Sequence, residues 1–365
     1  MTARPHTCDA LVVGLGPGGS AAAAAAARAG LAVVAIDRRA AIGIPVQCAE
    51  FIPLPLGRHA RDAGVLVQRI LGMTSALPSG TLHRTDFPGL MIDRTRFDAA
   101  LADAARAAGA TLCRGTALTG IDSGTDVATL RDAGGEFALR YRVLIAADGP
   151  RSRVAAALGL PRLETVETRQ YTVPLRRPGN ETEIWLAPEY PGGYAWLFPK
   201  GTTANLGLGM DPRLTRDLKR PLDRLHATLV AEGRVDPEIL ARTGGPIPVG
   251  GMRARLAERN VAFVGDAAGL THPITGAGIA AAVISGECAG ESAARYCAGD
   301  VEAWRAYDEE IRDQFATSLA RAVARRRWLV SRWKSVEARS DRLHRRGWIA
   351  FPEYFLDEEA SALAA

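Results

Sequence analysis

The chain has 365 residues, 47% of them hydrophobic and 23% charged, with a formal net charge of +5. That length supports a sizeable core in one large or two interleaved domains. The N-terminus leads straight into a strand without the features of a signal peptide, and no uninterrupted apolar stretch is long enough to predict a transmembrane span. Five scattered cysteines, none in CxxC spacing, argue against a disulfide framework or a metal site and favour a reducing cytoplasm.

The first predicted elements are those of a dinucleotide-binding unit. Residues 8–13 form a buried strand, residues 17–29 an alanine-rich helix and residues 31–36 a second strand. The turn before the helix reads Gly-Leu-Gly-Pro-Gly-Gly, whose glycines permit close approach to a pyrophosphate and close packing of helix on strand. Asp37 ends the second strand at the spacing expected for binding ribose hydroxyls. The sequence therefore predicts FAD or NAD contacts at Gly14, Gly16, Gly19, Asp37 and the adjacent Arg38.

Further along the chain, strands of nucleotide-binding type are separated by other β-structure. We expect a loop over residues 38–57, a helix over 96–109 and short strands over 111–147. A strand-rich block over 168–210, a helix over 214–232 and a mostly helical remainder from Gly276 onward follow. We therefore predict an α/β fold, with a discontinuous Rossmann-type FAD-binding domain, an inserted β-sheet substrate domain and a helical C-terminal region. The predicted FAD-binding domain comprises residues 1–75, 91–165 and 250–300. The predicted substrate domain comprises residues 76–90 and 166–249, and the C-terminal region comprises residues 301–365.

Residues 261–279 carry the second half of the predicted cofactor site. An apolar strand over 261–264 ends in Gly265-Asp266, and a turn rich in Pro and Gly then opens a helix of small residues. In an open α/β sheet this places a carboxylate where ligands bind, at the C-terminal end of a strand. The free N–H groups of the helix start point into the same crevice. A carboxylate suits a sugar hydroxyl and a positive helix end suits an electron-rich ring, so the pattern indicates a flavin site.

The motif order is GxGxxG, then Asp148-Gly149 after a buried strand, then Gly265-Asp266. This order resembles the para-hydroxybenzoate-hydroxylase-like FAD-dependent superfamily, which contains aromatic-ring hydroxylases, flavin halogenases and prenyl reductases. The resemblance implies FAD as cofactor, with Asp266 on the ribityl chain and the helix after Gly276 facing the pyrimidine end of the flavin. A separate NADPH domain is not expected, because there is no second GxGxxG. The cofactor contacts implied in this half are Asp148, Gly149, Asp266, Pro273, Gly276, Gly278 and Ile279.

Two further segments are similar to the geranylgeranyl reductase family. Residues 45–50, Pro-Val-Gln-Cys-Ala-Glu, resemble its PxxCGE motif with Ala49 in place of glycine, and residues 194–200 resemble its YxWxFPK motif. Ile92-Asp93-Arg94 resembles the start of the following helix. The resemblance implies that Cys48 lies near the flavin and that the aromatic motif lines a tunnel for an isoprenoid chain. The residues implied are Gln47, Cys48 and Arg94 for the cofactor, and Tyr194, Trp196 and Phe198 for the substrate.

The resemblance leads to a specific reaction, the reduction of isolated C=C bonds of a geranylgeranyl or other isoprenoid chain. Hydride would pass from N5 of the reduced flavin, and Cys48 or Glu50 would supply the proton. Each residue also has a structural alternative: Cys48 as a small buried hydrophobe, Glu50 as a solvated loop carboxylate, and the aromatic residues as sheet packing. Two other functions stay open, an FAD-dependent monooxygenase or halogenase acting through a flavin C4a-peroxide, and a flavin electron carrier without an organic product.

Residues 321–348 are rich in arginine and contain Trp328, Trp333 and Trp348. Basic residues mixed with tryptophan suit an anionic membrane surface. The alternative is a terminal helix whose tryptophans pack on the body of the protein. We expect a monomer in the cytoplasm, or at the inner face of the membrane, with a hydrophobic small-molecule substrate and an unidentified electron donor. Nucleic acid is not expected, because no binding module accompanies the charge.

Overall fold

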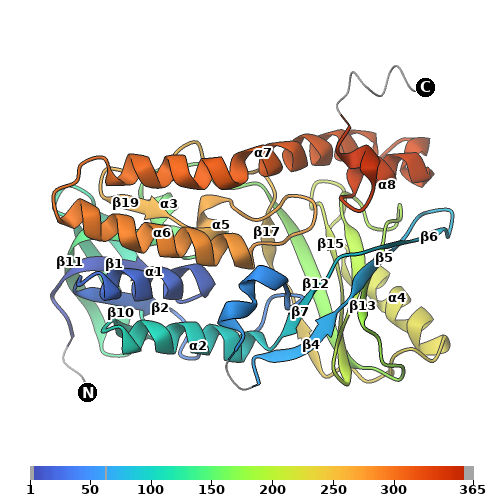
Figure 1. Ribbon diagram of the computed structural model, residues 1–365, viewed down its shortest axis with the longest axis horizontal. Helices are drawn as coiled ribbons and strands as arrows, with labels where there is room; N and C mark the ends of the chain where they lie inside the picture. Colours follow the sequence, from blue (N-terminus) through green and yellow to red (C-terminus); the bar gives the residue numbers. More distant parts are fainter. Residues whose placement is uncertain (1–3, 62–63, 357–365) are drawn as a thin grey trace.

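The computed structural model describes residues 4–61 and 64–356. Two eight-stranded sheets lie at opposite ends of the molecule, with a three-stranded sheet between them and long helices along one side (Figure 1). The predicted α/β fold with a Rossmann-type domain, a second β-sheet and a helical C-terminus is confirmed. Within the described part of the chain, no helix is long and apolar enough to cross a membrane.

The first sheet has the order β18-β19-β11-β1-β2-β8, and β11, β1, β2, β8 and β19 run parallel. Its strands are β1 (Thr7–Val13), β2 (Val33–Asp37), β8 (Thr111–Arg114), β9 (Ala117–Asp122), β10 (Val127–Asp132), β11 (Gly135–Ala146), β18 (Ala257–Glu258) and β19 (Val261–Phe263). The central strands are buried on both faces, which explains their continuous apolar runs. Because they are parallel, their carboxyl ends meet at one edge. The predicted cofactor motifs all begin at that edge.

Helices of small residues pack closely against this sheet. Helix α1 (Pro17–Arg28) and helix α6 (Ile279–Cys297) lie side by side, with α2 (Arg94–Ala107) beyond α1 (Figure 1). A Cβ at Gly286 would lie 2.1 Å from the carbonyl oxygen of Gly18, and one at Gly290 2.5 Å from that of Ala22. The alanine and glycine content therefore reflects backbone-to-backbone packing, which larger side chains would prevent.

The second sheet has the order β16-β12-β15-β14-β13-β5-β6. Its strands are β5 (Gly72–Ala76), β6 (Leu82–Thr85), β12 (Thr165–Pro174), β13 (Glu181–Trp185), β14 (Tyr194–Lys200), β15 (Thr203–Met210), β16 (Ala241–Thr243) and β17 (Pro246–Pro248). Helix α4 (Lys219–Ala231) covers one face, where its leucines pack against Ala195 and Leu197. Alternate residues of a strand point to opposite faces, so Tyr194, Trp196 and Phe198 share the other face.

Two details differ from the predicted elements. The helix expected near residue 214 begins at Lys219, because the Asp211 carboxylate accepts a hydrogen bond from the backbone N–H of Arg213 (2.9 Å) and holds this segment in a turn. The predicted loop over 38–57 contains strand β3 (Phe51–Pro53) and a short helix η1 (Leu54–His59). Strand β3 joins β7 (Gly89–Ile92) and β4 (Leu66–Ile70) in the three-stranded sheet.

The predicted domain boundaries stay a prediction, to which the sheets add one detail. Strand β5 pairs with β13 of the second sheet and begins at Gly72, four residues before the predicted boundary at residue 76. We therefore propose that the substrate domain begins at the start of β5. The short helices α3 (Arg153–Ala157) and α5 (Gly265–Ala268) follow strands of the first sheet, in agreement with the assignment of their segments to the cofactor half.

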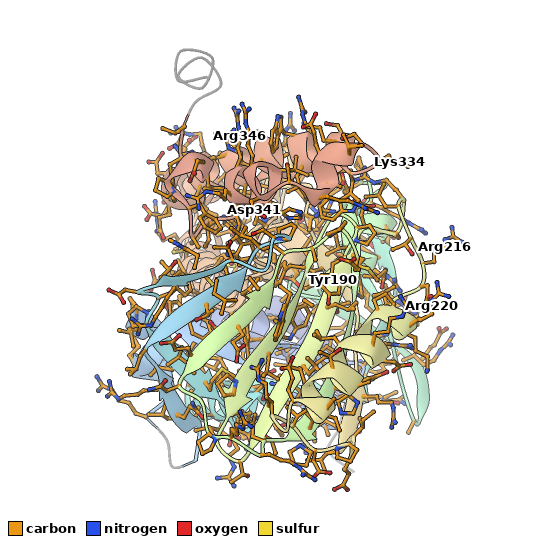
Figure 2. The ribbon with its side chains drawn as sticks, turned by 90° about the vertical axis from the view of Figure 1, so that its right-hand side faces the viewer. Tyr190, Arg216, Arg220, Lys334, Asp341 and Arg346 are labelled. Carbon is orange, nitrogen blue, oxygen red and sulfur yellow. The ribbon has the colours of Figure 1, made fainter. Side chains whose placement is uncertain are left out.

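The C-terminal region lies along the side of both large sheets. Helix α7 (Ala303–Arg332) runs from the nucleotide-binding half toward the second sheet, and η2 (Val336–Arg339), α8 (Asp341–Gly347) and η3 (Pro352–Tyr354) follow at its far end (Figure 1). Trp333 and Trp348 are 7% and 2% exposed, so these tryptophans pack on the body of the protein. Lys334 and Arg346 project outward at this end, on the same side as Arg216 and Arg220 (Figure 2). The inner side of the segment carries these tryptophans together with the buried Arg325 and Arg326, and exposed basic residues such as Lys334 lie on the outer side.

Candidate functional site

A cavity of about 550 Å³ lies between the two large sheets. Its walls come from the glycine loop, the loop around Cys48, the face of the second sheet opposite α4, and the turn that precedes α6. Most of the lining side chains are apolar or aromatic. Such a cavity is typical of a small-molecule site with a few polar groups that fix orientation.

The glycine loop leaves room for a ligand at the start of α1. Gly16 is the N-cap of this helix and lines the cavity, and a Cβ placed there would meet no protein atom within 4 Å. The other two glycines serve packing, since a Cβ at Gly14 would lie 2.4 Å from the carbonyl oxygen of Ala147 and one at Gly19 1.8 Å from that of Gly14. The open space at a helix N-terminus fits a pyrophosphate.

Asp37 is held at the tip of β2 beside this loop. Its carboxylate accepts hydrogen bonds from the backbone N–H groups of Leu15 (2.9 Å) and Arg39 (2.8 Å). This fixes the side chain next to the glycine loop, although Asp37 does not line the cavity, and its predicted role in binding ribose stays a prediction. Arg38 is exposed to solvent and is not one of the cavity-lining residues. Its predicted contact with the cofactor stays a prediction.

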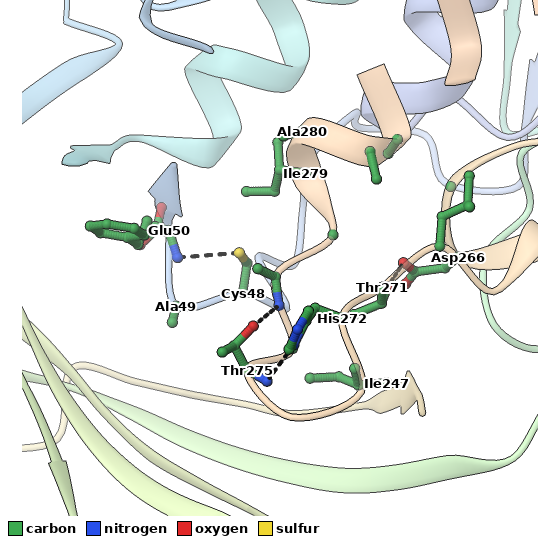
Figure 3. Close-up of a pocket in the computed structure, with 18 of the residues that line it drawn as sticks. Cys48, Ala49, Glu50, Ile247, Asp266, Thr271, His272, Thr275, Ile279 and Ala280 are labelled. Atoms are coloured by element: carbon green, nitrogen blue, oxygen red, sulfur yellow. Dashed lines mark hydrogen bonds between the residues drawn. The ribbon is translucent and has the colours of Figure 1, made fainter. Parts of the chain in front are cut away.

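The turn between β19 and α6 forms the opposite wall. Asp266 is buried at the cavity, where its Oδ1 accepts a hydrogen bond from the Thr271 hydroxyl (Figure 3). Burial raises the pKa of this carboxyl, and the Thr271 hydrogen bond and the charge of Arg94 act in the opposite direction. Gly276, Gly278 and Ile279 also line the cavity, so the N-terminus of α6 faces it. Among the predicted contacts in this turn, Pro273 does not line the cavity.

Asp148 lies between β11 and α3, and its neighbours Ala147 and Gly149 line the cavity. Its Oδ2 accepts hydrogen bonds from the backbone N–H groups of Arg153 (2.6 Å) and Val154 (3.1 Å), at the start of α3. Its Oδ1 is buried and receives no donor from the part of the chain described, and burial raises the pKa of the carboxyl. Asp148 itself does not line the cavity, so the fit to FAD rests on the open space at Gly16 and Gly149 and on the Asp266 carboxylate at the cavity wall.

The loop over residues 45–50 crosses from the first half of the molecule to the second sheet. Gln47 donates to the Gly244 carbonyl oxygen (2.7 Å), and two amide side chains of the sheet hold the loop backbone. Gln170 donates to the carbonyl oxygen of Cys48 (2.9 Å) and Asn205 to that of Ala49 (3.2 Å). Gln47 and Cys48 both line the cavity, as predicted for cofactor-contacting residues. The loop is therefore fixed by side chains that come from distant strands.

The Cys48 sulfur lies at the cavity with two polar neighbours. Its Sγ accepts a hydrogen bond from the Glu50 backbone N–H at 3.2 Å (Figure 3). Arg94 is buried next to the sulfur and forms a bidentate ion pair with Asp98, at 2.9 and 3.0 Å. Burial alone would lower the pKa of Arg94, but the charge of Asp98 and the adjacent sulfur raise it above its ordinary value. Cys48 therefore lies beside an ion pair in a polar corner rather than in an apolar core.

The alternative in which Glu50 is a solvated carboxylate is wrong, because Glu50 is 4% exposed. Its two oxygens accept hydrogen bonds from Lys200 (2.8 Å to each), Asn205 (2.8 Å) and the backbone N–H of Arg94 (2.9 Å). Its φ of +69° is in the left-handed region, which is unfavourable for a residue other than glycine. The geometry thus gives this carboxylate a positioning role, and its use as the proton donor stays a prediction.

The three aromatic residues of β14 form one wall of the cavity. Tyr194, Trp196 and Phe198 all line it, and the Tyr194 hydroxyl donates to the Thr275 carbonyl oxygen at 2.5 Å. Burial, and secondarily the nearby Cys48, raise the pKa of Tyr194. The Trp196 indole N–H donates to Gln170 at 3.2 Å, so the same glutamine fixes both the aromatic wall and the Cys48 loop.

Some residues at the cavity were not predicted from the sequence. Gln170 is a single polar residue in a strand, without any motif that could reveal it. Trp348 comes from a segment for which membrane contact and packing on the body were the two alternatives, and neither pointed to the cavity. Lys200, which ends the quoted aromatic motif, does not line the cavity but binds Glu50, and nothing local in the sequence indicates this pairing. His272 also lines the cavity; its Nδ1 accepts the Thr275 N–H at 3.2 Å (Figure 3), and burial lowers its pKa to about 4. It is a neutral loop histidine that accepts a backbone hydrogen bond.

Comparisons with known proteins agree with this geometry. The geranylgeranyl reductase catalytic domain matches residues 167–245, and an FAD binding domain matches residues 82–181. A digeranylgeranylglycerophospholipid reductase from Methanocella arvoryzae is 36% identical over 337 residues, covering 85% of this chain and 84% of the relative. A crystal structure of a geranylgeranyl bacteriochlorophyll reductase-like protein from Thermoplasma acidophilum has a TM-score of 0.82 and 28% identity, covering 92% and 95% of the two chains.

Flavin-dependent halogenases share the fold at lower identity. The structure of the halogenase CmlS has a TM-score of 0.73 at 18% identity, covering 99% of this chain and 70% of the halogenase. This likeness shows the common architecture alone. The likeness in sequence lies with the reductases.

Proposed function

Because the chain belongs to the geranylgeranyl reductase family of FAD-dependent oxidoreductases, we propose that it reduces isolated C=C bonds in a long isoprenoid chain. The observation that carries this proposal is the aromatic wall of β14, which faces the Cys48 loop and the predicted flavin turn across one apolar cavity. An isoprenoid chain has no polar groups along its length, so an apolar cavity of this kind binds it by excluding water.

The charged residues of the cavity limit where a polar headgroup can lie. Glu50, Arg94 and Asp266 are the charged side chains that line it, and each already has a partner within the described residues: Lys200, Asp98 and Thr271. A substrate phosphate drawn between the Cys48 loop and the aromatic wall of β14 would lose its water without gaining a free cation. We therefore propose that the isoprenoid tail lies inside and that a charged headgroup, such as that of a glycerophospholipid, stays at the mouth.

The protein side chains supply binding and the proton in this proposal. FAD, held by the glycine loop, Asp37 and Asp266, supplies a hydride when it is reduced. The Cys48 Sγ is the proton donor that we propose, because it lines the cavity and its lone pair is occupied by the Glu50 N–H. Glu50 and Gln170 hold the Cys48 loop in position, and the first N–H groups of α6 give the cavity a positive end.

The decisive experiment is anaerobic and uses the purified holoprotein. The flavin is reduced with dithionite, geranylgeranyl diphosphate is added, and the flavin absorbance and the product mass are followed together. We expect the absorbance of oxidised flavin to return while the product gains two hydrogens per reduced bond. A flavin that stays reduced until air is admitted, with an oxygen atom in the product, would reject the proposal in favour of the monooxygenase.

Substitution of the thiol tests the proton donor separately. We expect Cys48→Ala to keep its bound flavin but to reduce the isoprenoid at least about 100-fold more slowly, the usual loss for a general acid. Cys48→Ser provides a weaker acid at the same place and should show a larger solvent deuterium isotope effect than the wild type. Equal rates in Cys48→Ala and wild type would exclude the sulfur as donor.

We also propose electrostatic contact with an anionic lipid surface. Arg327, Lys334 and Arg342 are exposed on the C-terminal segment, whereas Trp333 and Trp348 are buried, so charge rather than tryptophan insertion would provide the attraction. The test is sedimentation with vesicles of phosphatidylcholine, with and without phosphatidylglycerol. Binding should require the anionic lipid, weaken with salt and be lost when all three residues are changed to Gln. Equal sedimentation with both vesicle types would contradict this contact.

A further inference from the structure

We propose that Trp348 closes the inner end of the isoprenoid cavity and thereby sets the longest chain that the protein accepts. This inference rests on the proposed function, since it concerns the length of the substrate tail. It assigns a specificity role to the C-terminal segment, which the sequence motifs do not connect with the site. Three observations carry it: a row of aromatic rings, the fixation of Trp348, and the difference in exposure between the two ends of the row.

Six aromatic side chains that line the cavity form a continuous row. Neighbouring ring centroids in the row are 4.8 to 6.5 Å apart. In spatial order they are Trp348, Tyr194, Trp196, Phe198, Phe51 and Phe87. Spacings of this size are those of packed aromatic pairs, so the rings form one wall rather than separate contacts.

The row has a closed end and an open end. Phe87 is 37% exposed, Trp196 is 7% exposed and Trp348 is 2% exposed. An apolar chain that follows the rings therefore enters beside Phe87 and ends against the Trp348 indole. Trp348 packs in one cluster with Leu77 and the fully buried Phe351, so densely packed side chains adjoin the ring at this end.

Trp348 is held firmly enough to act as a wall. Its indole N–H donates to the Ser75 hydroxyl of β5 at 3.1 Å, across 273 residues of sequence. Phe351, which is completely buried, stacks near His83 with ring centroids 4.6 Å apart and lies under the Arg345 guanidinium. The segment is also tied to α7, because Arg325 donates to the Tyr354 carbonyl oxygen at 2.9 Å. The Ser75 hydrogen bond fixes the Trp348 ring itself, and the contacts of Phe351 and Tyr354 fix the segment that carries it.

The experiment uses substrates of increasing length. Geranyl, farnesyl, geranylgeranyl and geranylfarnesyl diphosphates are given to the reduced holoprotein, and kcat and KM are measured for each. In the wild type we expect kcat/KM to fall sharply beyond one length. Trp348→Leu, which keeps an apolar side chain but shortens it, should raise kcat/KM for the next longer chain by about tenfold, mainly through KM. Trp348→Phe should lie between the two.

Trp333 provides the matched control. It is another buried tryptophan of the same segment, donates to the Pro188 carbonyl oxygen at 3.3 Å, and does not line the cavity. Trp333→Leu should lower the melting temperature to a similar degree without changing the order of preference among the four chains. A length profile that is the same in Trp348→Leu and wild type would overturn the inference.

A binding measurement separates this inference from the proposed reaction. Saturated alkyl phosphates of 10 to 25 carbons cannot be reduced, and their binding is read as a rise in melting temperature. Wild type should show a cut-off in length that Trp348→Leu shifts to longer chains. If the wild type reduces no isoprenoid, the proposed function fails while this shift still supports the role of Trp348. If the cut-off does not move, the role of Trp348 fails whatever the reaction.

Discussion

The cofactor end and the substrate end of the cavity are built in different ways. The cofactor end consists of backbone: glycines, alanines and helix termini at the edge of a parallel sheet, with two short carboxylates fixed by backbone N–H groups. The substrate end consists of long side chains that meet from distant segments, such as Lys200 with Glu50 and Trp348 with Ser75. A site built of backbone tolerates no added volume, whereas a site built of side chains tolerates volume but not the loss of a partner.

The largest effect expected from this comparison is at the α1–α6 contact. In Gly286→Val, the new side chain meets the Gly18 carbonyl oxygen, where a Cβ alone would lie at 2.1 Å. Neither backbone can retreat, so we expect a loss of at least about 3 kcal/mol in the free energy of unfolding, measured by urea titration. Gly16→Ala is the control, because its Cβ meets no protein atom within 4 Å. That variant should unfold like the wild-type apoprotein but bind less FAD. A full flavin content would contradict the proposal that the open space at Gly16 holds the FAD pyrophosphate.

The next largest effect on stability is expected at the substrate end, where a side chain loses its partner without any change in packed volume. Lys200→Met adds no volume but leaves the buried Glu50 carboxylate without its cation. Removal of one partner of a buried ion pair is costly, and we expect a loss of about 3 kcal/mol in the free energy of unfolding. Adding Glu50→Gln to Lys200→Met removes the unpaired charge, so the double variant should regain much of that stability. If the double variant is no more stable than Lys200→Met, the charge is not the cause.

The same difference explains what the sequence could and could not predict. Gly16 and Asp266 lie in short local patterns of strand, turn and helix, so their place at the cavity follows from the chain order. Gln170 and Asn205 are isolated polar residues in strands, and only the folded sheet brings them to the Cys48 loop. Local patterns report backbone geometry, whereas side-chain pairs between distant segments leave no periodic signal.

His272 provides a smaller, pH-dependent test on the cofactor side. Its pKa in the folded protein is lowered to about 4 by burial, against 6.5 for the free side chain. Between these values the unfolded chain binds a proton that the folded protein does not, so stability falls as the pH falls from 6.5 toward 4. At pH 5 this amounts to about 2 kcal/mol. His272→Asn can still accept the Thr275 N–H but does not titrate, so its free energy of unfolding should fall less between pH 7 and pH 5. Identical pH profiles would contradict this.

The smallest effect on stability is expected for a substitution at Ala49, where the motif and the structure lead to different expectations for the backbone. The related motif has glycine here, which would suggest that the loop needs backbone freedom at this residue. Among the described residues other than glycine, positive φ occurs at Glu50, Asp126 and Arg259, and Ala49 is not one of them. Its conformation is thus an ordinary one for alanine, and its side chain packs beside the cluster of Trp196 and Trp348.

Ala49→Gly should therefore destabilise the protein by only about 0.5–1 kcal/mol, because glycine increases the entropy of the unfolded chain. Turnover should not change, since Gln170 and Asn205 would still hold the carbonyl oxygens of Cys48 and residue 49. Urea titration and steady-state kinetics on the same preparation measure both quantities. A more stable or faster Ala49→Gly would mean that the loop is strained at this residue. The positioning of Cys48 would then depend on local backbone freedom, as at the cofactor end, rather than on the side chains that cross from the second sheet.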